Sequence, residues 1–199
     1  MPKIVDHEQR RQELAKATFK LISKSGLPNL TLTKVAKEVG LSLGAIAHYA
    51  RTREDLLLLA GDYAAALGAQ LAQAHLKNYS GIEALRRLLY EALPTTPLRA
   101  NSWLIWIDFC EGAKKNKKMR GLLVERHKEY QKWFSDRIEE AKNLGEIDST
   151  TDAARMAQSA TALVEGISVL ILMRGQSFPK RMQKSMIDDW ISGMLPPKQ

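Results

Sequence analysis

Cysteine is nearly absent from this 199-residue sequence, which contains only Cys110. One thiol cannot form an internal disulfide, and it does not by itself supply the thiolates of a zinc cluster. The four histidines are scattered along the chain with no spacing typical of a metal site: His7, His48, His75 and His127. We therefore expect neither a metal nor another cofactor.

Signatures of catalysis are also missing. The sequence has no Gly-rich phosphate-binding loop, and no serine or cysteine nucleophile has a plausible base nearby. These absences predict that the protein is not an enzyme.

The sequence has little that suggests a membrane. Its first residues, MPKIVDHEQRRQ, lack the apolar core of a signal peptide. The most apolar stretches are interrupted by Asp62 and Glu165 within the ~20 residues that a membrane span requires. We expect a cytoplasmic protein with no membrane partner.

Positive charge is concentrated at the start of the chain. The net charge is +8, and residues 1–53 hold ten Lys or Arg against four Asp or Glu. A basic segment followed by a near-neutral one suggests a polyanionic partner such as nucleic acid. Solubility alone is the plainer explanation of the same charge.

Strand-like alternation is absent, and apolar residues recur at helical spacing between Gly and Pro stops. The pattern predicts an all-α protein of about nine helices. A change in composition near Thr52 divides it into a helical head, residues 1–51, and a helical body, residues 52–199.

The head contains the spacing of a helix-turn-helix. Ala36 is small where two helices would cross, Gly40 suits a turn with positive φ, and Ile46 can anchor the second helix in the core. We predict short helices over residues 32–39 and 43–49, the first capped by Thr31 or Thr33 and the second by Ser42.

The predicted second helix carries almost no large side chains, so its backbone can approach DNA closely. We expect its start to contact bases and phosphates, hydroxyls to reach phosphate, and residues at its exit to bind the DNA backbone. The predicted DNA-binding residues are Thr31, Thr33, Ser42, Leu43, Gly44, Ala45, Ala47, His48, Tyr49 and Arg53. For Tyr49 a purely structural role in the core is an even alternative.

The run TLTKVAKEVGLSLGAIAHYARTREDLLLLA, which begins at Thr31, resembles the DNA-binding signature of the TetR family of repressors. The resemblance covers about residues 8–60 and within the family is most similar to the BetI group. It implies a helical body for ligand binding and dimerisation. Two positions depart from the pattern, because Ala47 and Ala50 stand where many members have aromatic residues. We expect Leu56, Leu57 and Phe19 to fill the space near Ala50.

The segment 153–174 is apolar on nearly all sides, which requires cover on all sides. We expect a homodimer through helices 153–174 and 179–194. The alternative is a central helix buried within a monomer.

Aromatic residues and one acid in the body are candidates for binding a cationic or apolar effector. They are Tyr90, Trp103, Trp106, Phe109, Cys110 and Glu165. The plainer interpretation places the aromatics in the core and pairs Glu165 with Arg174 or across a dimer.

The sequence thus predicts a ligand-responsive repressor that binds a palindromic operator in double-stranded DNA as a dimer. A non-specific DNA-compacting protein is the main alternative, and a membrane-surface adaptor is a weaker one. The effector, the operator and the choice between repression and activation are not encoded in any recognisable motif.

Overall fold

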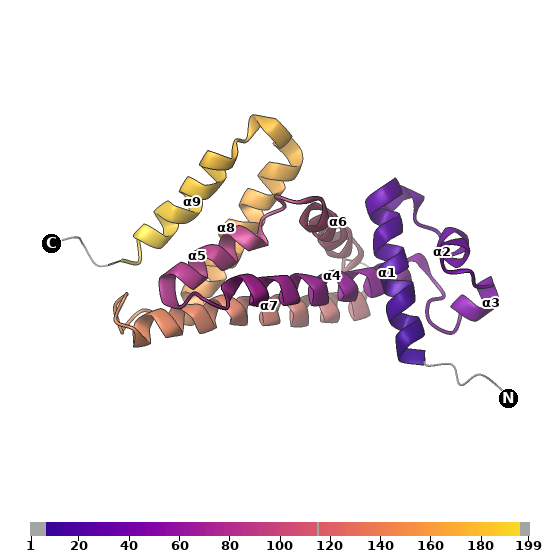
Figure 1. Cartoon of the computed structure of the whole chain (residues 1–199), viewed down its shortest axis with the longest axis horizontal. Helices are drawn as coiled ribbons and strands as arrows, with labels where there is room; N and C mark the ends of the chain where they lie inside the picture. Colours follow the sequence, from indigo (N-terminus) through magenta and orange to yellow (C-terminus); the bar gives the residue numbers. More distant parts are fainter. Residues whose placement is uncertain (1–6, 115, 196–199) are drawn as a thin grey trace. The chain divides into compact units, whose positions relative to one another are not determined.

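The computed structural model describes residues 7–114 and 116–195, and over these residues the protein is all-α, as predicted (Figure 1). Nine α-helices are formed in this part of the chain, again as predicted. They are α1 (His7–Ser25), α2 (Leu32–Val39), α3 (Leu43–Ile46), α4 (Arg53–Leu76), α5 (Gly81–Ala92), α6 (Pro97–Gly112), α7 (Lys117–Asn143), α8 (Ala153–Arg174) and α9 (Lys180–Ser192). There are two 3-10 turns: η1 (Leu27–Asn29) joins α1 to α2, and η2 (Gly175–Ser177) follows α8.

The chain divides into two compact units. The first contains the residues up to Gln70 together with Thr96–Asp108, and the second contains Leu71–Thr95 and the residues from Phe109 onward. The first unit is therefore larger than the head predicted over residues 1–51, because it includes most of α4 and of α6. The functional boundary at residue 51 remains a prediction.

The first unit is built around α1, α2 and α3. Its core contains side chains from all three helices and from the start of α4, each at most 7% exposed: Leu14, Phe19, Ile22, Val35, Ile46, Leu56 and Leu57. Ala50 is also buried, at 2% exposure. Phe19, Leu56 and Leu57, which we expect to fill the space near Ala50, are buried in the same unit.

The two helices of the helix-turn-helix begin at side-chain caps, as predicted. The Lys34 amide donates to the hydroxyl of Thr31 over 3.3 Å, so Thr31 and not Thr33 caps α2. At the start of α4 the cap is reciprocal. The Asp55 amide donates to the Thr52 hydroxyl at 3.1 Å, and the Thr52 amide donates to the Asp55 carboxylate at 3.0 Å.

Gly40 ends α2 in the left-handed conformation, with φ of 66° and ψ of 33°. No atom lies within 4 Å of the position that a Cβ would take there, so the demand for glycine comes from the backbone alone. We expect Gly40→Ala to lower the free energy of unfolding by about 1–2 kcal/mol.

Gly68→Ala is the matched control for Gly40→Ala. Gly68 is exposed inside α4 and also has no neighbour within 4 Å, so alanine should raise the unfolding free energy by about 1 kcal/mol. Urea unfolding followed by circular dichroism measures both changes. Equal effects of the two substitutions would contradict this account of the turn.

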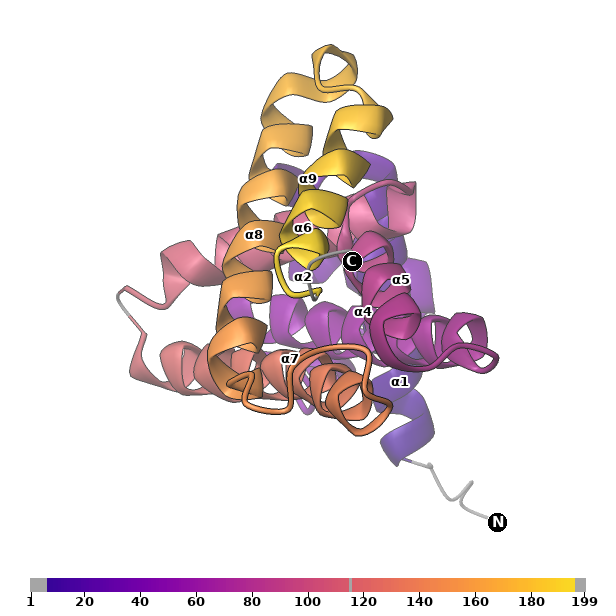
Figure 2. The same ribbon diagram turned by 90° about the vertical axis from the view of Figure 1, so that its left-hand side faces the viewer.

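The second unit is a bundle in which α7 packs along α5 and α8, and α9 packs on α5 (Figure 2). After η2 the chain reverses, and α9 returns beside α8 (Figures 1 and 2). The indole N–H of Trp190 on α9 donates to the Ser159 hydroxyl on α8 at 3.0 Å. The core of the second unit includes Leu85, Leu89, Phe134, Ile138, Val164, Ile167, Ile187 and Ile191.

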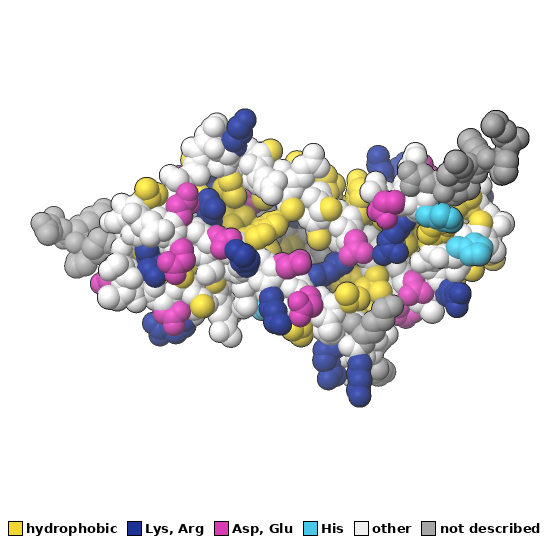
Figure 3. Space-filling model, turned by 90° about the horizontal axis from the view of Figure 1, so that it is seen from below, with side chains coloured by type: hydrophobic (Ala, Val, Ile, Leu, Met, Phe, Trp, Pro, Cys, Tyr) yellow, Lys and Arg dark blue, Asp and Glu magenta, His cyan; other side chains and the backbone are white. Residues whose placement is uncertain are grey.

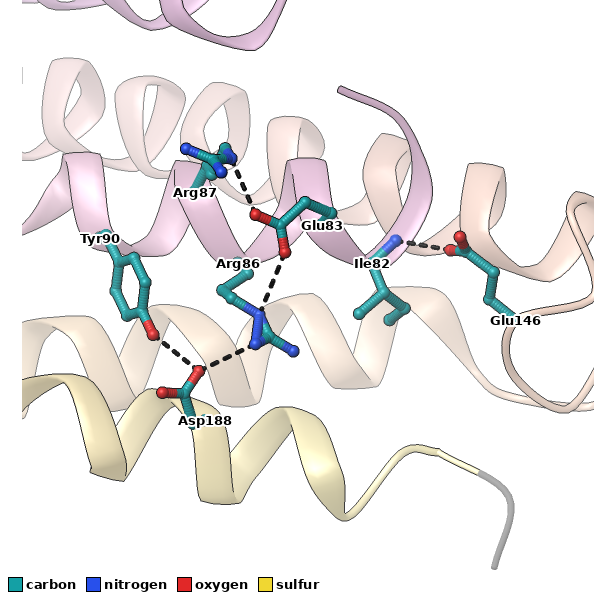
Figure 4. A network of polar contacts seen from close by, with 7 residues as sticks. All are labelled: Ile82, Glu83, Arg86, Arg87, Tyr90, Glu146 and Asp188. Atoms are coloured by element: carbon teal, nitrogen blue, oxygen red, sulfur yellow. Dashed lines mark hydrogen bonds and ion pairs between the residues drawn. The ribbon is translucent and has the colours of Figure 1, made fainter. Parts of the chain in front are cut away.

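Polar contacts fix α5 within this bundle (Figure 4). The Tyr90 hydroxyl donates to Asp188 on α9 at 2.6 Å, and Arg86 forms an ion pair with the same carboxylate at 3.2 Å. At the other end of α5, the Ile82 amide donates to Glu146 at 2.7 Å. The contacts tie the helix to α9 and to the segment that follows α7.

The length and apolar composition of α8 would by themselves suit a membrane span. One such helix is weak evidence, because the core helix of a soluble protein has the same properties. The buried residues of α8 lie along one face, as the core contact of a bundle helix requires: Ala153, Ala157, Ala160, Thr161, Val164, Ile167 and Ser168.

Candidate nucleic-acid interface

The helix-turn-helix presents α3 on a rigid local frame. Its N-cap is Ser42, whose hydroxyl accepts a hydrogen bond from the Ala45 amide at 3.2 Å. Ile46 is completely buried and anchors the inner face, as predicted. The outer face of α3 is consequently held in a fixed orientation within the first unit.

The second helix of the motif is shorter than predicted. It ends at Ile46 and not at Tyr49, since the Tyr49 amide donates to the Ile46 carbonyl at 2.8 Å in a tightened turn. The Ala50 amide donates to the same carbonyl at 2.9 Å. Residues 47–49 therefore form a turn that leads toward α4.

Nearly all the predicted DNA-binding residues are accessible on the first unit. Leu43 is 51% exposed. Ala45 and Tyr49 are half-buried. The remaining exposed members of the predicted set are Thr31, Thr33, Ser42, Gly44, Ala47 and His48. The exposed residues from Ser42 to His48 thus make a surface of mostly small side chains around α3, with one exposed leucine, while Thr31 and Thr33 are exposed at the start of α2.

Gly44 leaves the centre of this surface open. A Cβ built there would meet only the Ser42 hydroxyl, at 3.9 Å, which is an ordinary contact. The fold therefore tolerates a side chain at this position. The missing side chain allows another molecule to approach the backbone of α3.

Tyr49 lies beside a residue that the sequence did not single out as part of the interface. The His7 Nδ1 atom is 3.0 Å from the Tyr49 hydroxyl, and the two ring centroids are 6.0 Å apart. Figure 3 shows histidine side chains exposed together on the surface of the first unit. His7 and Tyr49 are 42 residues apart, so no sequence spacing could have revealed this contact.

Three further basic residues accompany the predicted set. Lys34 and Lys37 are exposed on α2, and Arg51 is exposed in the connection to α4. The asymmetry in charge between the two ends of the sequence was the only signal for them. They add positive charge to the unit that carries α3, as phosphate binding requires.

Arg53 is engaged inside the first unit. One guanidinium nitrogen, Nη1, donates to Asp108 Oδ2 at 3.2 Å, and Nη2 donates to Asp108 Oδ1 at 3.5 Å and to the Leu27 carbonyl at 3.4 Å. The prediction of Arg53 as a phosphate contact did not anticipate this partner.

The predicted effector residues fall into different surroundings. Trp103 and Trp106 are half-buried in the first unit. Tyr90 belongs to the second unit, where its hydroxyl bonds to Asp188 and burial raises its pKa. Phe109, Cys110 and Glu165 are also in the second unit.

Glu165 on α8 lies near Cys110 at the end of α6. The His127 Nδ1 atom is 3.6 Å from the Glu165 carboxylate, so neither Arg174 nor a second subunit is needed to pair this acid. Burial raises the pKa of Glu165, and His127 partly opposes that shift. Burial, with a smaller contribution from the Glu165 carboxylate, raises the pKa of the Cys110 thiol.

Phe109 completes this group from its buried position on α6. It is 3% exposed, and the Arg126 guanidinium carbon is 5.8 Å from the centre of its ring. The second unit thus places an aromatic ring, a thiol and a partly buried carboxylate near the same part of α7. Among the described residues, no group of three or more His, Cys, Asp or Glu side chains is arranged to hold a metal ion.

Two family models match the chain. The model described as bacterial regulatory proteins of the TetR family matches residues 14–60. The model described as the BetI-type transcriptional repressor, C-terminal, matches residues 81–196. The first match contains the helix-turn-helix, and the second contains α5 to α9.

Individual proteins similar to this chain are also transcriptional regulators. The HTH-type transcriptional regulator BetI of Agrobacterium fabrum is 24% identical over 202 residues, which cover 98% of this chain and 92% of that protein. The regulator PksA of Bacillus subtilis is 32% identical over 120 residues, and this match spans only 58% of its length. A transcriptional regulator from Saccharomonospora viridis, solved in complex with choline, shares the fold with a TM-score of 0.82 and 22% identity, over 96% of this chain and 100% of that one.

Proposed function

The chain belongs to the TetR family of bacterial transcriptional regulators, and on that premise we propose that it is a repressor that binds a palindromic operator as a homodimer and is released by a small molecule. The observation that carries the DNA-binding half is the open surface around Leu43 and Gly44, held in place by the buried Ile46. The protein is a regulator and not an enzyme, and we place it in the cytoplasm.

DNA recognition follows from this surface. The backbone of α3 at Gly44 can approach base edges in the major groove, while Leu43 and Ala47 can contact thymine methyl groups. The hydroxyls of Thr31 and Thr33 and the basic residues of α2 can bind phosphates, which position the protein on the duplex. Two such motifs, related by a two-fold axis, would read half-sites about 34–36 Å apart.

This arrangement needs a dimer, and the exposed outer face of α8 is the observation that supports one. Opposite its buried face, this helix exposes a stripe at helical spacing: Ala162, Gly166, Val169 and Met173. Val169 is 40% exposed, Met173 is 78% exposed, and Met182 near the start of α9 is 50% exposed. A helix with one face in its own core and an apolar second face fits a four-helix interface between two copies.

The effector half of the proposal centres on Phe109, Cys110 and Glu165. A partly buried carboxylate beside an aromatic ring can hold a cationic small molecule by charge pairing and cation–π contact. A structurally similar regulator was solved with choline, which carries one positive charge, and this supports the same chemical class for this chain. An effector that prefers a conformation with low DNA affinity would release the operator.

Removal of the Tyr49 hydroxyl tests the exit of the motif. We expect Tyr49→Phe to weaken operator binding about ten- to a hundredfold, the loss of one hydrogen bond to a charged phosphate, with little change in thermal stability because the His7 contact of this hydroxyl is exposed. Tyr63→Phe, the same change on α4, should leave affinity unaltered. Gel-shift titration measures both variants, and wild-type affinity of Tyr49→Phe would remove the Tyr49 hydroxyl from the proposed interface.

The rival proposal is a DNA-compacting protein that uses only basic charge. Affinity for DNA falls with salt in both cases, so salt dependence does not separate them. Footprinting on the DNA upstream of the protein's own coding region does. A repressor should protect two symmetric half-sites about one helical turn apart, and uniform protection would favour compaction.

Release of the same DNA can be used to identify the effector. Cationic and apolar small molecules, beginning with choline, would be added to the protein–operator complex, and release measured as loss of the footprint. Release by apolar compounds alone would remove Glu165 from the proposed site.

A further inference from the structure

Arg53 joins three separate segments of the first unit. It is the first residue of α4, it donates to the Leu27 carbonyl in η1, and its two terminal nitrogens donate to the two carboxylate oxygens of Asp108 on α6. The side chains are 37% and 26% exposed, so both are accessible to solvent and neither is isolated in the core. This geometry is that of a two-pronged arginine–carboxylate pair.

The pair conflicts with the phosphate contact that the sequence predicts for Arg53. A guanidinium has five N–H donors, and those on the outer nitrogens that would grip a phosphate are partly committed to Asp108 and Leu27. The carboxylate also neutralises the positive charge that a phosphate would attract. Asp108 and a DNA phosphate are therefore competitors for the same side chain.

Asp108 is next to proposed effector residues along the chain. Its carboxylate is carried by α6, and the next two residues of that helix are Phe109 and Cys110, both in the proposed effector site. A ligand that displaced this end of α6 would move the Asp108 carboxylate relative to Arg53. Charge at the start of α4 would then depend on the state of α6.

We propose that Asp108 is a positioning residue that withholds Arg53 from DNA phosphate and thereby limits the affinity of the protein for its operator. This inference rests on the proposed DNA-binding function. It adds a residue outside the helix-turn-helix that controls a phosphate contact within the motif's own unit.

Asp108→Asn tests the proposal, because asparagine has the same shape and no charge. Operator binding of the purified full-length protein would be measured by fluorescence anisotropy between 50 and 200 mM salt, chosen because the loss of affinity with salt counts phosphate contacts. We expect affinity to rise about two- to fivefold and the slope of log K against log salt to steepen by up to about 0.9, the value for one added phosphate contact.

Glu111→Gln is the matched control. Glu111 is exposed three residues further along α6, so this change alters net charge by the same amount at a different place. Any gain shared by Glu111→Gln is a general charge effect and is subtracted. Thermal unfolding of each variant establishes that it is folded before its binding is interpreted.

Arg53→Ala completes a double-mutant cycle with Asp108→Asn. In an Arg53→Ala background, Asp108→Asn should give no gain beyond that of Glu111→Gln, because the released side chain is no longer present. An equal gain in both backgrounds, or an Asp108→Asn variant that binds as the wild type or more weakly, would overturn the proposal. If the wild type itself shows no sequence preference, the proposed function fails instead, and the two failures are distinguished.

Discussion

Gly44→Glu is expected to abolish operator binding and leave the fold intact. The position is exposed on α3, and a Cβ there meets only the Ser42 hydroxyl at 3.9 Å, so the protomer accepts a side chain. The introduced carboxylate would lie where the backbone should approach DNA. It would block the approach to the base edges and repel the phosphates, which carry the same negative charge. Such a juxtaposition costs several kcal/mol, which corresponds to a loss of at least about a hundredfold in affinity.

Gly68→Glu is the control that makes this result specific. Gly68 is exposed on α4 in the same unit, has no neighbour within 4 Å of its Cβ position, and would gain the same charge. Fluorescence anisotropy on the operator should show near wild-type binding for Gly68→Glu, apart from a small effect of net charge. Equal losses for the two variants would show that charge, and not contact at α3, governs binding.

Gly166→Arg is expected to convert the proposed dimer to a monomer. Gly166 lies in the exposed stripe of α8, and no atom of the protomer is within 4 Å of its Cβ position. In the proposed interface, an arginine would hold the partner helix away or bury an unpaired charge, at a cost of about 3–5 kcal/mol. We expect the dimer dissociation constant to rise at least about a hundredfold.

The protomer should not be destabilised by this change. Arginine is a better helix former than glycine by roughly 0.5–1 kcal/mol, so the folded monomer gains local stability. Gly121→Arg on α7, also exposed and without near neighbours, makes the same substitution outside the stripe. Sedimentation analysis should show a dimer for Gly121→Arg and a monomer for Gly166→Arg. A dimeric Gly166→Arg protein would move the interface away from this face of α8.

Local features of the head were predictable because each is dictated by short-range chemistry. The positive φ of Gly40, the cap at Ser42 and the burial of Ile46 all follow from neighbouring residues. The end of α3 was not predictable to the residue. Helical spacing continues through Tyr49, whereas the chain tightens at Ile46 through a three-residue hydrogen bond that no residue type enforces.

Contacts between distant segments set the limit of sequence reasoning. Arg53 matches a phosphate-binding position by sequence, but its pairing with Asp108 joins residues 55 apart. The apolar character of α8 predicts a helix that is covered on all sides, by its own core or by a partner. Only the structure shows that one face is buried within the protomer and that the other, around Gly166, is exposed.

Sequence-specific recognition of DNA is the central claim, and one competition measurement tests it most directly. Fluorescence anisotropy of the purified protein would compare the DNA just upstream of its own coding region with a scrambled duplex of equal length and composition, at one fixed salt concentration. Preference of about a hundredfold or more for the native duplex is the predicted result, since a specific site is typically bound at least about a thousandfold more tightly than non-specific DNA. Equal affinity for both duplexes, extending to every other segment around the coding region, would contradict it.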